Sequence, residues 1–178
     1  ELAKKFVQLK WMVVGISRNE HKLQKLEKKL GKDFYALKAD ISNEKDVIDS
    51  FNYIEKKFNK IDLIINNAAI FKMDKFIDCS FEDINSIVDT NLKGIMYCTL
   101  KAVKIMKQNS KGGRIVNIGS VAAINGIENQ AIYSASKFGL NGFAEALNQE
   151  IIKHNISIST IFPGGIDTPL WNKNNPYP

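Results

Sequence analysis

Tyr133 and Lys137 carry side chains suited to acid–base chemistry, and they are four residues apart. On an α-helix this spacing puts both residues on one face, about 6 Å apart along the axis. An ammonium group near a phenol lowers the phenol's pKa, which makes the tyrosine a usable general acid or base. The same spacing occurs in two pairs that we interpret as solvated helix neighbours, Tyr53/Lys57 and Tyr97/Lys101. The spacing alone therefore does not identify a site.

A serine thirteen residues before Tyr133 distinguishes this tyrosine from the others. Ser120 follows an apolar run at 114–119 that is typical of a strand, whereas the equivalent positions before Tyr97 and Tyr53 are Ile84 and Asp40. A hydroxyl at a strand end that faces a phenol at a helix start could hold a carbonyl oxygen between two donors. The simpler alternative, that Ser120 only ends a strand, stays open at this point.

Apolar runs of strand type alternate with longer amphipathic patterns along the chain. Strands separated by helices of ten or more residues form a parallel sheet, so the sequence predicts a single-domain α/β fold over residues 1–178, with a doubly wound, Rossmann-like sheet. Ligands bind beyond the carboxyl ends of such strands. The predicted strands are 12–16, 34–38, 61–65, 114–119 and 156–162; the predicted helices are 19–30, 42–58, 80–106 and 131–154.

Composition excludes several classes of protein. The 178 residues include 25 Lys+Arg and 19 Asp+Glu, a net charge of +6, and 44% are hydrophobic, which is sufficient for a packed core. Because the lysines are scattered and only Arg18 and Arg114 are arginines, we expect no nucleic-acid partner. No apolar run is long enough to cross a bilayer and no signal peptide is recognisable, so we expect a soluble, cytoplasmic protein with no membrane partner. Cys79 and Cys98 have no metal-ligand spacing, and we expect no metal site.

Five motifs together resemble the short-chain dehydrogenase/reductase family, in its 3-oxoacyl-carrier-protein-reductase-like type. They are Asn66-Asn67-Ala68-Ala69, Asn91 within 89–94, Ser120, the Tyr133/Lys137 pair, and the segment 163–168 that begins Pro163-Gly164. The resemblance implies that hydride passes between a nicotinamide cofactor and a small-molecule carbonyl or alcohol substrate. It also implies a homodimer or homotetramer.

The resemblance assigns a role to each of four catalytic residues. Tyr133 exchanges the proton with the substrate oxygen, and Ser120 holds that oxygen. Lys137 lowers the pKa of Tyr133 and contacts the nicotinamide ribose, while Asn91 anchors a water that links Lys137 to solvent. An exposed polar position on a helix is the alternative for Asn91. Ser134 and Ser136 are interpreted as small hydroxyls around the helix start and are left out of the catalytic set.

The cofactor is predicted to be NADP(H) rather than NAD(H). Ser17 and Arg18 follow the first strand in the sequence, where an acidic residue would favour NAD and an arginine favours the 2′-phosphate of NADP. An ordinary surface arginine is the alternative. The resemblance adds cofactor contacts from Tyr133 and Lys137 and from Asp40, Ile41, Asn67, Ala68, Ala69, Pro163, Gly164, Ile166 and Thr168. Alanine stands at Ala69 where the family usually has glycine, a mild change.

The family's first strand and its glycine-rich turn have no counterpart in the sequence. We expect about 15 to 20 further residues before Glu1, with the strand lying between those at 12–16 and 61–65. Two alternatives to an active enzyme stay open: a cofactor-sensing scaffold without turnover, and an inactive fragment. Phe138 and Ile152 point away from the apolar stripe formed by Leu140, Phe143, Leu147 and Ile151, which indicates a partner surface, with ordinary surface exposure as the alternative. The resemblance implies that oligomers form through the helices of Tyr133 and Asn91.

Overall fold

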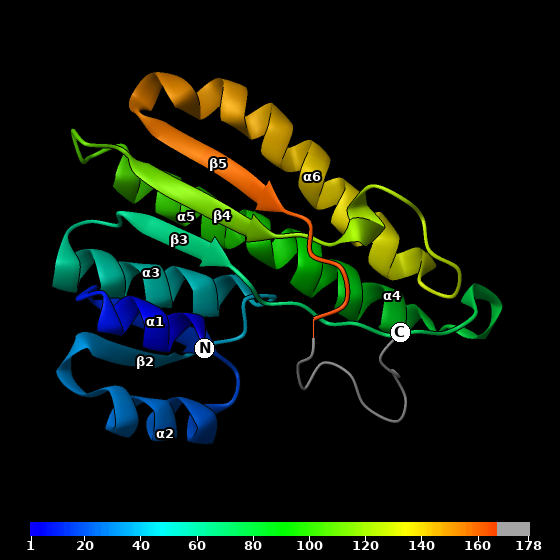
Figure 1. The fold of residues 1–178 in the computed structure, drawn as a ribbon, viewed down its shortest axis with the longest axis horizontal. Helices are drawn as coiled ribbons and strands as arrows, with labels where there is room; N and C mark the ends of the chain where they lie inside the picture. Colours follow the sequence, from blue (N-terminus) through cyan, green and yellow to red (C-terminus); the bar gives the residue numbers. More distant parts are fainter. Residues whose placement is uncertain (167–178) are drawn as a thin grey trace.

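Helices and strands alternate along residues 1–166, the part of the chain that the computed structural model describes (Figure 1). The predicted parallel, Rossmann-like α/β fold is confirmed. The strands are β1 (Val13–Ser17), β2 (Phe34–Lys38), β3 (Leu63–Asn66), β4 (Gly113–Ile118) and β5 (Ile156–Ile161). The helices are α1 (Leu2–Gln8), α2 (Glu20–Leu30), α3 (Glu44–Phe58), α4 (Phe81–Val88), α5 (Ile95–Met106) and α6 (Ala131–Ile151).

The strands form two parallel ladders. β1 pairs with β2, with Ser17 opposite Lys38, and β4 pairs with β3 on one side and β5 on the other. Within residues 1–166 no strand lies between β1 and β3, which is the place where the sequence analysis expects the family's first strand. All the carboxyl ends of the strands point to the same edge of the molecule (Figure 1).

The helix starts follow ordinary capping rules, with one correction. Asn19 accepts a hydrogen bond from the backbone of Lys22 at 2.9 Å and caps α2. The helix predicted over 42–58 begins at Glu44, with Asn43 as its cap, and Ser42 donates instead to Asp40. The carboxylate two residues earlier captures this hydroxyl, which removes it from the helix end.

The predicted helix 80–106 is wrong as a single helix. A π-helical turn at 89–94 separates α4 from α5. Ser80 and Asp83 form a capping box at the start of α4, as the sequence pattern allows. π-Helical turns occur often at functional sites, and this one contains Asn91.

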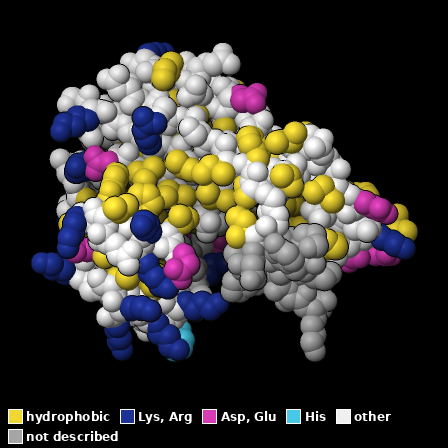
Figure 2. Space-filling model, in the orientation of Figure 1, with side chains coloured by type: hydrophobic (Ala, Val, Ile, Leu, Met, Phe, Trp, Pro, Cys, Tyr) yellow, Lys and Arg dark blue, Asp and Glu magenta, His cyan; other side chains and the backbone are white. Residues whose placement is uncertain are grey.

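The main core lies between α3, α5, the end of α6 and the strands. Its buried members include Phe51, Ala102, Met106, Ile115, Ile151 and Ile156. In β4 the buried Ile115 and Asn117 alternate with Val116 and Ile118, which are only half-buried. Figure 2 shows hydrophobic side chains in a band across the middle of the face viewed in Figure 1. The core holds the strands so that their carboxyl ends form one edge, where the site lies.

Candidate active site

Ser120, Tyr133 and Lys137 come together at the junction of β4 and α6. Tyr133 is 8% exposed and Lys137 is 2% exposed. The Ser120 side chain lies near the Tyr133 hydroxyl and acts on its pKa. The Lys137 ammonium lies 5.6 Å from the centre of the Tyr133 ring and donates to the carbonyl of Ile118 at 2.9 Å. The structure thus brings the three residues together, as the sequence spacing indicated.

The electrostatics of this cluster differ from our expectation. Burial raises the pKa of Tyr133, and the hydrogen bond with Ser120 opposes this rise without cancelling it. Burial also lowers the pKa of Lys137, to about 8. The expected net lowering of the Tyr133 pKa is therefore wrong for this structure, because removal from water outweighs the influence that favours the phenolate; stabilisation of the phenolate by Lys137 stays a prediction. Tyr133 is a protonated phenol at neutral pH and can donate its proton.

Asn91 lies within the π-helical turn and is fully buried, so the alternative of an exposed helix position is wrong. Its Oδ1 accepts from the backbone N–H of Ile70 at 2.7 Å, and its Nδ2 donates to the carbonyl of Ile70 at 2.8 Å. The same Nδ2 also donates to the Ser136 hydroxyl at 3.2 Å. The side chain therefore fixes the segment after β3 to the start of α6; the water relay through Asn91 stays a prediction.

Two further residues contact Tyr133: Ser136, to which the sequence analysis gave no role, and Phe71, which it missed. Ser136, 1% exposed, donates to the carbonyl of Tyr133 at 2.7 Å. The Phe71 ring meets the Tyr133 ring edge-on, with 4.9 Å between ring centres. The three-residue spacing of Ser136 from Tyr133 was a usable signal. Phe71 gave none, because its contact with Tyr133 spans 62 residues of sequence.

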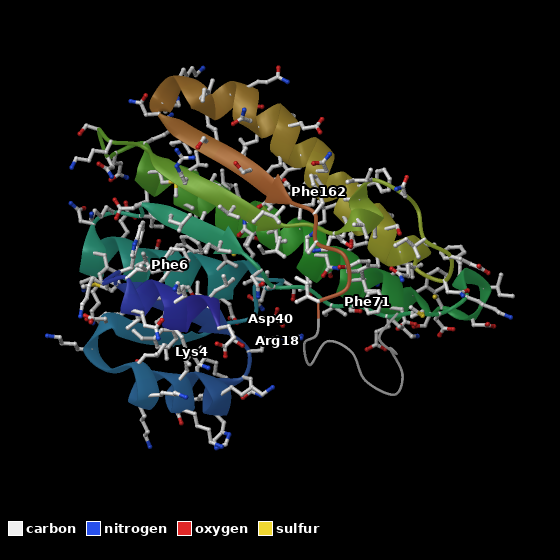
Figure 3. All side chains as sticks on the ribbon, viewed as in Figure 1. Lys4, Phe6, Arg18, Asp40, Phe71 and Phe162 are labelled. Atoms are coloured by element: carbon white, nitrogen blue, oxygen red, sulfur yellow. The ribbon has the colours of Figure 1, made fainter. Side chains whose placement is uncertain are left out.

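A second cluster occupies the carboxyl ends of β1 and β2. Arg18 and Asp40 form an ion pair with 3.6 Å between the Nη1 and Oδ2 atoms, and Figure 3 shows them side by side. Burial tends to raise the pKa of Asp40, but two hydrogen bonds from Ser42 and the Arg18 guanidinium outweigh it and lower this pKa. Ser17 is exposed at the end of β1, where its hydroxyl accepts from the backbone of Asn19 at 3.3 Å.

The remaining predicted cofactor residues lie along the same edge. Ile41 contacts the π-helical turn so closely that a Cβ added at Gly94 would lie 2.7 Å from the Ile41 carbonyl oxygen. The carbonyl of Pro163 accepts from the backbone of Val121 at 3.0 Å, which ties the segment after β5 to the Ser120 loop. Thr168 lies outside the described residues. After β3, Asn67 and Ala68 are exposed and Ala69 is half-buried; after β5, Gly164 and Ile166 are exposed.

The Tyr133 cluster offers two hydroxyl donors, Ser120 and Tyr133, beside the buried amine of Lys137. The β1–β2 ladder adds the guanidinium of Arg18 and the carboxylate of Asp40. Among residues 1–166, no group of three or more His, Cys, Asp or Glu side chains could hold a metal ion. In the same range, no helix has the length and apolar character needed to span a membrane.

Comparisons with known proteins agree with this geometry. A family model described as short chain dehydrogenase matches residues 1–177. The 3-oxoacyl-[acyl-carrier-protein] reductase of Bos taurus is 34% identical over 169 residues, which are 95% of this chain and 71% of the bovine protein. Carbonyl reductase family member 4 of Danio rerio is 36% identical over 159 residues, which are 89% of this chain and 66% of the fish protein. The chain spans 65% of the corresponding reductase of Buchnera aphidicola.

Solved structures give the same result. A 3-ketoacyl-(acyl-carrier-protein) reductase from Brucella melitensis, complexed with NADH, matches with a TM-score of 0.90 at 30% identity and covers 95% of this chain and 71% of that one. A metagenomic short-chain oxidoreductase in complex with NADP matches with a TM-score of 0.86 at 25% identity, over 93% of this chain and 76% of that one. The chain belongs to the short-chain dehydrogenase family of oxidoreductases and is similar to its 3-oxoacyl-[acyl-carrier-protein] reductases.

Proposed function

We propose that this chain interconverts a small-molecule carbonyl and the corresponding alcohol with a nicotinamide cofactor, and that Tyr133 is its general acid and base. The observation that carries the proposal is that the Ser120 and Tyr133 side chains lie together beside the buried Lys137. Two adjacent hydroxyls can both donate to one carbonyl oxygen. Membership of an oxidoreductase family supports the reaction class.

Ser120, Tyr133 and Lys137 have different roles in the proposed carbonyl reduction. The cofactor, when bound, supplies hydride to the carbonyl carbon. Ser120 orients the carbonyl oxygen, and Tyr133 donates its proton to that oxygen as negative charge develops there. The Lys137 ammonium then stabilises the phenolate that Tyr133 becomes. Alcohol oxidation reverses these steps, with the Tyr133 phenolate accepting the proton.

The described residues fit the two ends of a dinucleotide. Arg18 and Ser17 offer donors for a 2′-phosphate at the end of β1, and no carboxylate occupies their positions, so we propose NADP(H) as the preferred cofactor. Asp40, Ile41, Asn67, Ala68 and Ala69 would face the adenosine half. Pro163, Gly164 and Ile166, with Tyr133 and Lys137, would face the nicotinamide half.

Replacing Tyr133 tests the reaction. Tyr133→Phe removes the proton donor and keeps the ring, so turnover of a carbonyl substrate with NADPH should fall about 100-fold or more. Tyr53→Phe is the matched control, because Tyr53 forms a hydrogen bond with Lys57 at the same four-residue spacing. Unchanged turnover in Tyr133→Phe would overturn the assignment of Tyr133. A cofactor-sensing scaffold would instead bind NADPH and show no turnover in the wild type.

Fluorescence titrations with NADPH and NADH test the cofactor. Arg18→Gln should weaken NADPH binding about tenfold or more and leave NADH binding unchanged, since only NADPH carries the phosphate. Arg114→Gln is the matched control. Arg114 is the other arginine of the sequence and is exposed at the amino end of β4, away from the carboxyl ends of the strands. Equal losses for both cofactors in Arg18→Gln would contradict a role for Arg18 in phosphate recognition.

A further inference from the structure

The side chain of Asn91 reaches Tyr133 along two routes that are separate from the water relay. One route runs through Ser136 to the Tyr133 backbone, and the other runs through Ile70 and Phe71 to the Tyr133 ring. We propose that Ser136 and Phe71 are positioning residues for Tyr133, which hold its hydroxyl against Ser120. This inference rests on the proposed role of Tyr133 and adds the residues that set its position.

The backbone route is fully hydrogen-bonded. Asn91 Nδ2 donates to the Ser136 hydroxyl at 3.2 Å, and that hydroxyl donates to the carbonyl of Tyr133 at 2.7 Å. A serine hydroxyl has one proton, so acceptance from Asn91 and donation to Tyr133 fix its orientation. Both side chains are at most 1% exposed. No water competes for these bonds in so buried a position.

The ring route begins at the segment after β3. Asn91 binds both the N–H and the carbonyl of Ile70, as a neighbouring strand would. The next residue, Phe71, is 8% exposed and meets the Tyr133 ring at an interplanar angle of 85°. Edge-to-face pairs of this kind favour one relative orientation of the two rings. Phe71 therefore limits rotation of the Tyr133 ring.

The start of α6 needs such support because its own cap is weak. Gln130 occupies the N-cap position and makes no side-chain hydrogen bond to the helix. Tyr133 lies in the first turn, where an uncapped helix frays most readily. Loss of either route would let the Tyr133 hydroxyl move relative to Ser120, and such small displacements reduce turnover strongly.

The pKa of Tyr133 reports how close its hydroxyl lies to Ser120, and an NMR titration measures this pKa. The protein is labelled with ¹³Cζ-tyrosine, and the Tyr133 signal is identified by its loss in Tyr133→Phe. Ser120, Phe71 and Lys137 surround the ring, and the Lys137 amine is already neutral in the pH range where Tyr133 titrates. In Ser136→Ala we expect a weaker Ser120 bond, a Tyr133 pKa above that of the wild type, and a kcat about tenfold lower at unchanged KM. Ser134→Ala is the matched control, since Ser134 is also buried but its hydroxyl accepts only a long 3.5 Å bond from Ile127.

Phe71→Leu tests the second route and keeps the proposal testable if Ser136→Ala does not fold. Leucine retains apolar volume but removes the ring edge, so the Tyr133 ring signals should shift and kcat should fall. If the folded variants show the same Tyr133 pKa, the same ring signals and the same kcat as the wild type, the proposal is overturned. If the wild type shows no turnover, the proposed function fails, and the titration and ring signals still decide whether Ser136 and Phe71 position Tyr133.

Discussion

Lys137 is the residue whose titration should be visible in the stability of the whole protein. The unfolded chain holds this proton up to the ordinary pKa of 10.5, whereas the folded chain loses it near pH 8 because the amine is buried. Between these values the unfolded state binds more protons, so the free energy of unfolding contributed by this residue rises with pH. The full rise corresponds to about 3 kcal/mol.

The measurement compares the wild type with Lys137→Met in chemical denaturation from pH 7.5 to pH 10. The wild type should gain stability relative to the variant across this interval. Taking the difference removes the contributions of titrating groups that lie away from Lys137. A constant difference would mean that the Lys137 amine keeps its ordinary pKa in the folded chain.

At the residue scale, the sequence was sufficient for groups that share a short segment. Tyr133 and Lys137 were found because one helix turn separates them, and Ser120 because it follows a recognisable strand. The direction of the Tyr133 pKa shift was predicted wrongly, since the spacing of two residues says nothing about how much water surrounds them. Phe71 was missed because its contact with Tyr133 is made only in the folded chain.

At the element scale, the strands and most helices were predictable from their hydrophobic patterns, and the exceptions have local causes. The apolar residues from 80 to 106 read as one helix, yet residues 89–94 form a π turn, in which the side chain of Asn91 hydrogen-bonds the backbone of Ile70. The Gly94 backbone then approaches Ile41 closely. A pattern of apolar residues indicates which face of a helix is buried, but it does not indicate that the backbone of Gly94 approaches Ile41.

The contact between the π-helical turn and Ile41 predicts opposite effects for two glycine substitutions. The methyl group of Gly94→Ala would lie 2.7 Å from the Ile41 carbonyl oxygen, so this variant should lose about 1 to 3 kcal/mol of unfolding free energy. Gly142→Ala on α6 meets nothing within 4 Å and should gain about 0.5 to 1 kcal/mol. Thermal unfolding of both variants decides the point, and equal stabilities would contradict the close packing at Ile41.

At the scale of the whole molecule, the two ladders are joined through their helices. Ile16 and Ile41 from the first half pack against the core cluster that contains Phe51 and Ile115. This arrangement puts the Arg18/Asp40 pair and the Tyr133 cluster on one edge, although no strand within residues 1–166 connects β1 to β3.

The outer surface of α5 and α6 predicts self-association. A groove between these helices is lined by Met96, Tyr97, Leu100, Val103, Phe143 and Leu147, so Phe143 and Leu147 of the apolar stripe also line a surface groove. Leu100 is 54% exposed at this groove, and Phe138 on the same helix as Phe143 is 44% exposed. Apolar surface of this kind on a monomer marks a partner interface, and the expected partner is a second copy of the chain.

Light scattering coupled to size-exclusion chromatography tests this interface. We expect the wild type to elute as a dimer or tetramer and Leu100→Glu to elute as a monomer, because the carboxylate would be desolvated between two copies. Ile77→Glu is the control: Ile77 is 87% exposed but lies outside the groove, so its substitution should leave the oligomer intact. A monomeric wild type would rule out the interface. An oligomer that both substitutions leave unchanged would place the interface elsewhere on the molecule.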